Sequence, residues 1–225
     1  MISQPVLGAI AAHTQAVERG EVECRFEQCP RCGQRSSGFK CHAWRRRWFY
    51  VIVDRMVRRV RSAVTRWKCV ACEKTFTGYP DFALPYKRYV RQDLCRLSER
   101  YVFDDGLSYR KAVQVHGMPV FYDAIENASH PIDERMLSHS TLHRWIGFLG
   151  GLKQTLAQAW QLIRAKSPSC DLFRCHVAVP SWKYRSEPRR GLLHRCGRLL
   201  HADQAYRHLF EISIFTHLAT VCRWR

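Results

Sequence analysis

Two Cys-x-x-Cys pairs are the residues of this chain whose type and spacing point most directly to chemistry. Cys29 and Cys32 form the first pair, and Cys69 and Cys72 form the second. Each pair fits a tight turn that aims two sulfurs at one ion, so four thiolates together complete a tetrahedral Zn²⁺ site. Gly33, after the first pair, tolerates the positive φ that such a turn often requires, and Phe76, after the second, can cap the site. Because four sulfurs leave no open position for a water nucleophile, the predicted zinc is structural. Four unrelated cysteines are the alternative interpretation.

The segment between the two cysteine pairs is strongly basic and also aromatic. From Arg35 to Lys68 it holds 11 Lys and Arg against a single acid, Asp54, within a chain whose net charge is +18. Basic and aromatic side chains on one sheet favour nucleic acid, through phosphate neutralisation and contact with sugars or bases. A solvated surface without a partner is the alternative. The candidate contact residues of this segment are Arg45, Arg46, Arg47, Arg58, Arg59, Arg61, Arg66 and Lys68.

Composition limits the classes of protein to which the chain can belong. With 225 residues, of which 46% are hydrophobic, it has the material for a packed core and is not disordered as a whole. The first 20 residues do not resemble a secretory signal, and no stretch approaches the roughly 20 apolar residues of a membrane span. We therefore expect a cytoplasmic protein without a membrane partner, whose cysteines serve metal binding and the core.

The fold class predicted from the pattern of elements is α+β, a small antiparallel zinc ribbon followed by a helical bundle. The expected strands are Glu21–Phe26, Gly38–Trp44, Arg46–Val53 and Val57–Lys68, with a turn at Asp54-Arg55. The expected helices are Tyr86–Phe103, Tyr109–His116, Thr141–Leu149, Leu152–Lys166 and one around Pro188–Phe210, with Gly150-Gly151 as an interruption. Ser108 is the expected cap of the second helix, and Ser138 or Ser140 that of the third. The predicted division is an N-terminal extension (1–20), the zinc ribbon (21–79), a helix-turn-helix-like domain (80–166) and a C-terminal helical tail (167–225).

The helices from about residue 91 to residue 149 fit a helix-turn-helix arrangement. In such a unit the last helix enters the major groove with its N-terminal residues on base edges. Ser140, His143 and Arg144 are then the candidate DNA contacts, beside Ser138 and His139, while Leu142, Trp145 and Ile146 pack inward. An ordinary helical bundle that contacts no nucleic acid is the alternative, and the segment before the last helix is much longer than the usual turn.

These motifs together resemble a known family over roughly residues 21–149. Cys-Pro-Arg-Cys-Gly at 29–33, the basic strands, Arg-Trp-Lys-Cys-Val-Ala-Cys at 66–72 and Ser-His-Ser-Thr-Leu-His-Arg-Trp at 138–145 carry the resemblance. Their order is similar to the N-terminal zinc ribbon and helix-turn-helix of bacterial insertion-sequence transposases. The resemblance implies zinc on Cys29, Cys32, Cys69 and Cys72, and recognition of transposon-end DNA by the helices.

The chain departs from that family after Gly150. The transposases continue into an RNase-H-like domain whose three carboxylates hold two Mg²⁺ ions, whereas four acids follow here: Asp171, Glu187, Asp203 and Glu211. We therefore expect a DNA-binding protein of a mobile element, or a regulator derived from one that binds an operator duplex, and not an enzyme. The alternatives are a fragment of an active transposase that works with a separate catalytic subunit, a protein that binds RNA or RNA polymerase, and a protein-interaction adaptor.

Overall fold

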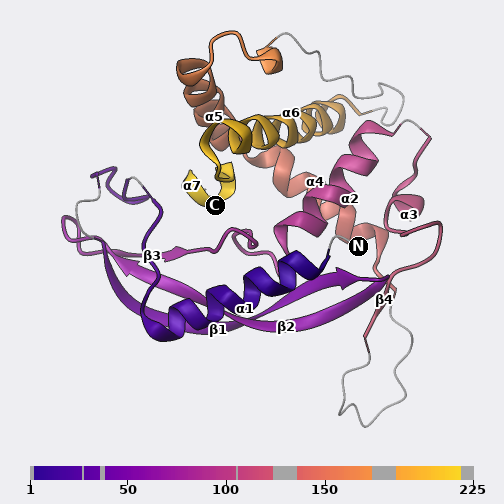
Figure 1. Ribbon diagram of the computed structural model, residues 1–225. Coiled ribbons are helices and arrows are strands. Elements are labelled where there is room, and N and C mark those ends of the chain that lie inside the picture. The colour runs from indigo at the N-terminus through magenta and orange to yellow at the C-terminus, as the bar shows by residue number, and fades with distance from the viewer. Residues whose placement is uncertain are drawn as a thin grey trace.

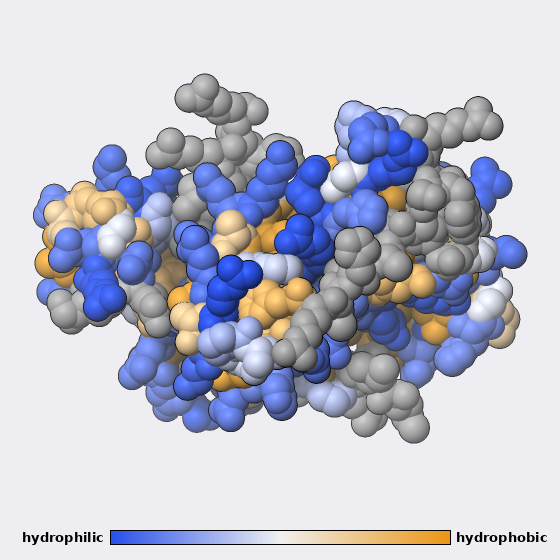
Figure 2. Space-filling model, turned by 90° about the horizontal axis from the view of Figure 1, so that it is seen from above, coloured by the Kyte–Doolittle hydropathy of each residue, from blue (hydrophilic) through white to orange (hydrophobic). Residues whose placement is uncertain are grey.

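The computed structural model describes residues 3–26, 28–35, 39–104, 106–123, 136–173 and 186–218, and it confirms the α+β class. A long β-hairpin forms one layer, and most of the helices form a second layer that packs on one end of it (Figure 1). Figure 2 views the molecule from above and shows hydrophilic side chains around smaller hydrophobic areas, as a basic chain of this composition requires.

The hairpin consists of β1 (Lys40–Val53) and β2 (Met56–Lys68), which pair antiparallel along almost their whole length. Its two-residue turn lies at Asp54-Arg55, as predicted, and both residues have positive φ (45° and 68°). Turns of this kind match the right-handed twist of the strands they join. The prediction of two separate strands before the turn was wrong, because the arginines at 45–47 continue β1 and only a bulge between Cys41 and Ala43 disturbs its register.

Two short strands complete the sheet on the far side of β2. β3 (Thr75–Gly78) pairs antiparallel with the end of β2, and β4 (Phe121–Tyr122) pairs in parallel with its start. Glu21–Phe26, predicted as a strand, belongs to no strand; it is extended chain that leads from α1 (Ser3–Arg19) to the first cysteine pair. The local β-propensity of this segment was misleading because pairing needs a free neighbouring strand.

α1 lies along the hairpin in Figure 1 and covers one of its faces. Val6 and Ile10 of the helix pack in one hydrophobic cluster with Phe49, Val51 and Val64 of the strands. Thr14 and His13 add polar contacts, from the Thr14 hydroxyl to Ser62 Oγ (2.8 Å) and from His13 Nε2 to the Ala63 carbonyl oxygen (3.2 Å). The N-terminal segment is thus part of the packed ribbon.

The helical layer begins with three helices whose starts and ends the sequence predicted in part. α2 (Arg91–Phe103) starts later than expected, because Tyr89 pairs with the edge of β1 at Tyr50 instead of joining the helix. α3 (Tyr109–Ala112) begins after the predicted cap Ser108 but ends early, ahead of a turn at His116. α4 (His139–Gly151) starts at Ser138, one of the two predicted caps, whose hydroxyl accepts a hydrogen bond from the Ser140 N–H (3.2 Å).

Three further helices and a 3-10 turn close the helical layer: α5 (Lys153–Lys166), η1 (Asp171–Phe173), α6 (Glu187–Phe210) and α7 (Ile214–His217). α6 packs against α2, α4 and α5 and buries Leu193, Leu199 and Tyr206 completely. The last helices therefore share one core with residues of the predicted 80–166 domain. The domain limits themselves remain predictions from the sequence.

The predicted break between two helices at Gly150-Gly151 lies one residue later, because α4 runs through both glycines and ends at its cap residue Leu152, before α5 begins. A Cβ at Gly150 would lie 2.3 Å from the backbone oxygen of Leu192 on α6, so only glycine allows the two helices to approach so closely. Arg195 uses this proximity to donate a hydrogen bond to the Gly150 carbonyl oxygen (2.9 Å). The glycine thus serves packing between helices rather than a break in one.

Candidate metal centre and basic hairpin face

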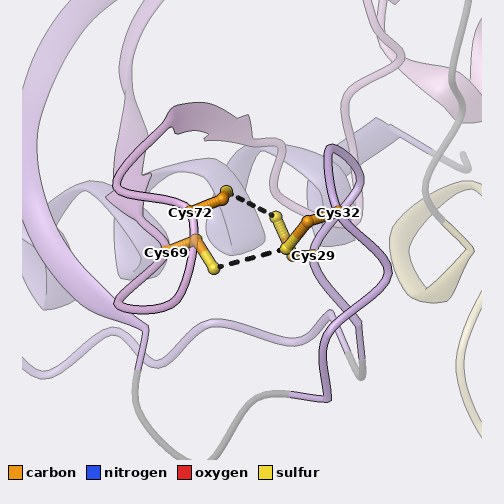
Figure 3. Close-up of side chains that lie close together, drawn as sticks. All are labelled: Cys29, Cys32, Cys69 and Cys72. Atoms are coloured by element: carbon orange, nitrogen blue, oxygen red, sulfur yellow. Dashed lines mark hydrogen bonds between the residues drawn. The ribbon is translucent and has the colours of Figure 1, made fainter.

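The four predicted cysteines converge at the end of the hairpin away from its turn. Their sulfurs all lie within 4.8 Å of one another, with Cys29 and Cys72 separated by 3.8 Å and Cys32 and Cys69 by 3.9 Å (Figure 3). Four sulfurs at about 2.3 Å from a central ion lie about 3.8 Å apart in a tetrahedron. They are much farther apart than bonded sulfurs in a disulfide. The cluster therefore has the size of a tetrathiolate metal site.

The two cysteine turns have the same backbone design. The Cys29 N–H donates to the Gln34 carbonyl oxygen (2.9 Å), and the Cys69 N–H donates to that of Lys74 (3.0 Å). In each turn the residue after the second cysteine is left-handed, with φ of 74° at Gly33 and 57° at Glu73. The sequence predicted this role for Gly33, whereas at the second turn a glutamate adopts a conformation that glycine enters more easily.

The surroundings of the four sulfurs favour the thiolate form at Cys69 and disfavour it at Cys32. The pKa of Cys69 is lowered to about 7 because the Cys72 and Ala71 backbone N–H groups donate to its sulfur. At Cys32 the Gln34 N–H acts in the same direction, but desolvation and the three neighbouring sulfurs outweigh it and raise the pKa to about 11. Four adjacent sulfurs cannot all ionise without a cation, which is the condition that a metal ion satisfies.

Aromatic side chains enclose the inner side of the cluster. Cys29 and Cys69 are buried together with Trp67 and Phe76, and Phe39 packs edge-on against the Phe76 ring at 4.9 Å between centroids. This confirms the predicted placement of Phe76 over the site. Throughout the described ranges, the four cysteines are the one group of three or more side chains that could hold a metal ion.

The basic residues of the hairpin divide between its two faces, because successive side chains in a strand point to opposite sides. Trp48 lies opposite Arg61, and Tyr50 lies opposite Arg59, so these side chains share a face. We call the exposed part of it the Trp/Arg face, which consists of Trp44, Arg46, Trp48, Arg59 and Arg61. The other five predicted contact residues belong to the face that α1 partly covers: Arg45, Arg47, Arg58, Arg66 and Lys68.

Arginine and tryptophan contact each other on the Trp/Arg face. The guanidinium carbons of Arg59 and Arg61 lie 3.9 Å and 5.6 Å from the centroid of the Trp48 ring, and that of Arg46 lies 5.9 Å from Trp44. On the opposite face, Arg47 instead donates to the Lys87 carbonyl oxygen (3.0 Å) and so ties two segments of the protein together. The basic residues predicted as one group thus have different roles.

The three candidate residues of α4 are all exposed at its N-terminal half, as the sequence predicted. Ser140, His143 and Arg144 face solvent, while Leu142, Trp145 and Ile146 are buried. Partial burial and the nearby Arg189 lower the pKa of His143. The long segment before α4 falls partly in residues 124–135, outside the described residues.

An aromatic chain links the hairpin to α4. The Tyr50 ring contacts Tyr89, and Tyr89 in turn contacts Trp145 of α4, with ring centroids 5.2 Å and 4.7 Å apart. The Tyr89 hydroxyl is hydrogen-bonded to that of Tyr122 beside the hairpin turn. Tyr50 lies on the same side of the hairpin as the Trp/Arg face, so these ring contacts connect the basic face to α4.

A buried ion network is the main polar feature that the sequence did not reveal. Arg91, 2% exposed, pairs with Asp81 (2.8 Å) and with Asp203 (3.3 Å), which lies 112 residues away in the chain. Asp203 also accepts hydrogen bonds from Ser213 Oγ (2.7 Å) and the Ile214 N–H (3.0 Å). No local spacing signals a contact of this range.

Comparison with known proteins places one family model on the chain. A domain of unknown function (DUF6431) matches residues 29–108, a range that holds both cysteine pairs, the hairpin and α2. No curated protein and no solved structure matches the chain. Among the described helices, none has both the length and the apolar character needed to cross a bilayer.

Proposed function

We propose that the protein binds DNA and that its four-cysteine cluster holds a structural Zn²⁺ ion. The Trp/Arg face carries the proposal: three arginines and two exposed tryptophans occupy one side of a strand pair in a chain of net charge +18. Such a face supplies phosphate neutralisation together with aromatic contact. The metal holds the end of the hairpin that has little core of its own, and so keeps the face in shape.

The sulfur-to-sulfur distances support zinc as the metal. Distances of 3.8 Å and 3.9 Å suit tetrahedral thiolate coordination, and thiolate ligands favour soft or borderline ions such as Zn²⁺. Because the protein would supply all four ligands, the ion has no open position and its role is structural. Metal analysis of the purified protein, with one zinc per chain as the expected result, tests this part.

α4 is the element proposed to add sequence preference. Ser140, His143 and Arg144 are exposed on its first turns, where side chains of a docked helix reach base edges. In this proposal the target is a duplex such as a transposon end or an operator, and the protein acts in the cytoplasm. A separate transposase catalytic subunit is a further proposed partner.

The proposal assigns binding rather than catalysis to this chain. Of the four acids after Gly150, Asp203 is committed to Arg91, Ser213 and Ile214, and Glu187 pairs with Arg190 at the surface. The buried contacts of Asp203 support a structural role for that carboxylate. Strand transfer by the purified protein with Mg²⁺, abolished by Asp203→Asn, would contradict the assignment.

The test is the salt dependence of DNA binding. Fluorescence polarisation with a labelled duplex should give an affinity that falls steeply as salt rises. In the double variant Arg59→Ala/Arg61→Ala, the slope of log affinity against log salt should be smaller by about two, because two phosphate contacts are lost. The variant Arg45→Ala/Arg58→Ala removes the same charge from the other face of the hairpin and is the matched control. A flat salt response of the unmodified protein would refute the proposed function.

A further inference from the structure

Two tryptophans are exposed at the centre of the hairpin although the protein buries most of its large apolar side chains. Trp44 and Trp48 are 43% and 40% exposed and lie on the same face of β1. Four residues of extended strand separate their positions by about 13 Å. Two large rings at this spacing offer flat apolar surface at two points along one strand.

The neighbours of Trp48 show how the face is organised. Arg59 stacks on its ring at 3.9 Å, and Arg61 lies at 5.6 Å, so one indole holds two guanidinium groups in place. A stacked guanidinium keeps its N–H groups directed outward, where phosphate oxygens can accept from them. The face therefore combines aromatic surface with guanidinium groups that are already positioned to bind phosphate.

Acidic side chains are nearly absent from this part of the hairpin. Asp54, at the turn, is the one acid between Arg35 and Lys68. Glu18 of α1 is 3.4 Å from Arg46, and both side chains are about half exposed, so this ion pair is weak. The face is complementary in charge to a polyanion.

Duplex and unpaired DNA differ in what they offer to such a face. In a duplex the flat faces of the bases are stacked on each other, and a protein at its surface meets phosphates, sugars and base edges. An unpaired strand exposes base faces, which stack on aromatic side chains while basic groups follow the backbone. Arginines are sufficient to bind the phosphates of a duplex, whereas stacking of a base on the exposed part of an indole requires an unpaired base.

We propose that the Trp/Arg face binds single-stranded DNA, with bases stacked on Trp44 and Trp48 and phosphates held by Arg46, Arg59 and Arg61. This inference rests on the proposed DNA-binding function and specifies the form of DNA that this face takes. It separates three roles: the arginines of the hairpin face bind the phosphates of either form of DNA, its two indoles select an unpaired strand, and α4 contacts a duplex. DNA in which a duplex adjoins an unpaired strand would engage all three.

The experiment compares a labelled oligothymidine of about 15 nucleotides with a duplex of the same length, by fluorescence polarisation at fixed salt. Trp44→Ala/Trp48→Ala should weaken binding of the single strand roughly tenfold or more, because base stacking is lost, and should change duplex binding less than about threefold. Arg59→Ala/Arg61→Ala should weaken binding of the single strand as well. Arg45→Ala/Arg58→Ala, which removes the same charge from the other face, is the control and should weaken it clearly less than Arg59→Ala/Arg61→Ala.

Each outcome separates this inference from the function on which it rests. The tryptophan variant could weaken the binding of duplex and single strand equally, or weaken the binding of neither. In both cases the indoles do not stack on unpaired bases, so the inference fails while the proposed DNA binding stands. The same assay also uses an oligouridine, the RNA counterpart of the same length. If the protein binds it more tightly than oligothymidine, the assignment to DNA is overturned. Binding of no nucleic acid at all would overturn the proposed function itself. Trp44→Phe/Trp48→Phe, which keeps an aromatic ring at each position, should restore part of the lost affinity and excludes misfolding as the cause.

Discussion

The two ends of the β1–β2 hairpin are held in different ways. At the turn, Ile52 and Val57 belong to the large core that also contains Trp145 and Leu142 of α4. At the other end, the buried cluster consists of Cys29, Trp67, Cys69 and Phe76, with Phe26 and Phe39 packed against it. The same pair of strands thus passes from an extensive hydrophobic core to a small cluster built around four sulfurs.

The comparison explains why the proposed metal ion would stabilise one end of the hairpin and is not required at the other. Burial of apolar surface stabilises roughly in proportion to its area, so the turn end is stabilised by the helical layer. The cysteine end has too little apolar surface to order two left-handed turns and a strand edge unaided. Metal coordination supplies the missing free energy in small domains of this kind.

Removal of the metal is expected to have the largest effect, and to act on one end only. Cys69→Ser should remove bound zinc, and the loss of coordination, on the order of 10 kcal/mol in small zinc domains, should unfold the cysteine turns. Hydrogen exchange should then become fast at the amides of Cys29 and Cys69, whereas α2 and α4 keep their protection. Cys24→Ser is the matched control, since Cys24 packs beside the cluster but lies outside the group of four. Simultaneous loss of protection in α4 would show that the two ends are not independent.

The parts of this architecture that depend on local sequence could be predicted. Short-spaced cysteines, the turn at Asp54-Arg55 and the hydroxyl cap at Ser138 each act within a few residues, so their positions in the chain determine their structure. The inward packing of Trp145 and the exposure of Arg144 follow from helical periodicity in the same way. The four-cysteine cluster was predictable because each half of it is a local motif.

The parts that depend on distant contacts were not predictable. Glu21–Phe26 has the composition of a strand but no place in the sheet, and Gly150 has the composition of a helix break but a place against α6. Arg91 appears in the sequence as one more surface cation, yet it is buried against Asp203. The division of the arginines between the two faces of the hairpin could have been predicted from the register of β1 and β2. The alternation of side chains along a strand gives these faces once β1 is recognised as one continuous strand.

The second prediction concerns the turn end of the hairpin, which packs on the helical layer. A substitution within that layer should destabilise it. Gly150→Ala places a methyl group 2.3 Å from the Leu192 oxygen, which the backbone of α6 cannot avoid without moving. Overpacking of this kind costs about 1–3 kcal/mol in the free energy of unfolding, which urea denaturation followed by circular dichroism measures. Gly151→Ala, with no atom within 4 Å of the added carbon, should be neutral or slightly stabilising. Bound zinc should stay at one per chain in both glycine variants. If the two variants are equally stable, α4 and α6 can move apart at little cost in free energy.

The smallest expected effect concerns the hydrogen bond that ties β1 to α2. The Asp93 carboxylate, nearly buried, accepts from the Ile52 N–H at 2.7 Å, and burial raises the pKa of Asp93 to about 6. Because this pKa lies above its unfolded value, the folded protein binds more protons between about pH 4 and pH 6, and the stability due to this group is lost as the pH rises through that range. Asp93→Asn keeps an oxygen acceptor but cannot ionise. Its stability relative to the unmodified protein, measured by urea denaturation, should therefore rise by about 1 kcal/mol between pH 4 and pH 5. A relative stability that stays constant or falls over this range would mean that the Ile52 N–H and Arg96 fully compensate the buried charge. The turn end would then be held by this charged contact as well as by its hydrophobic core.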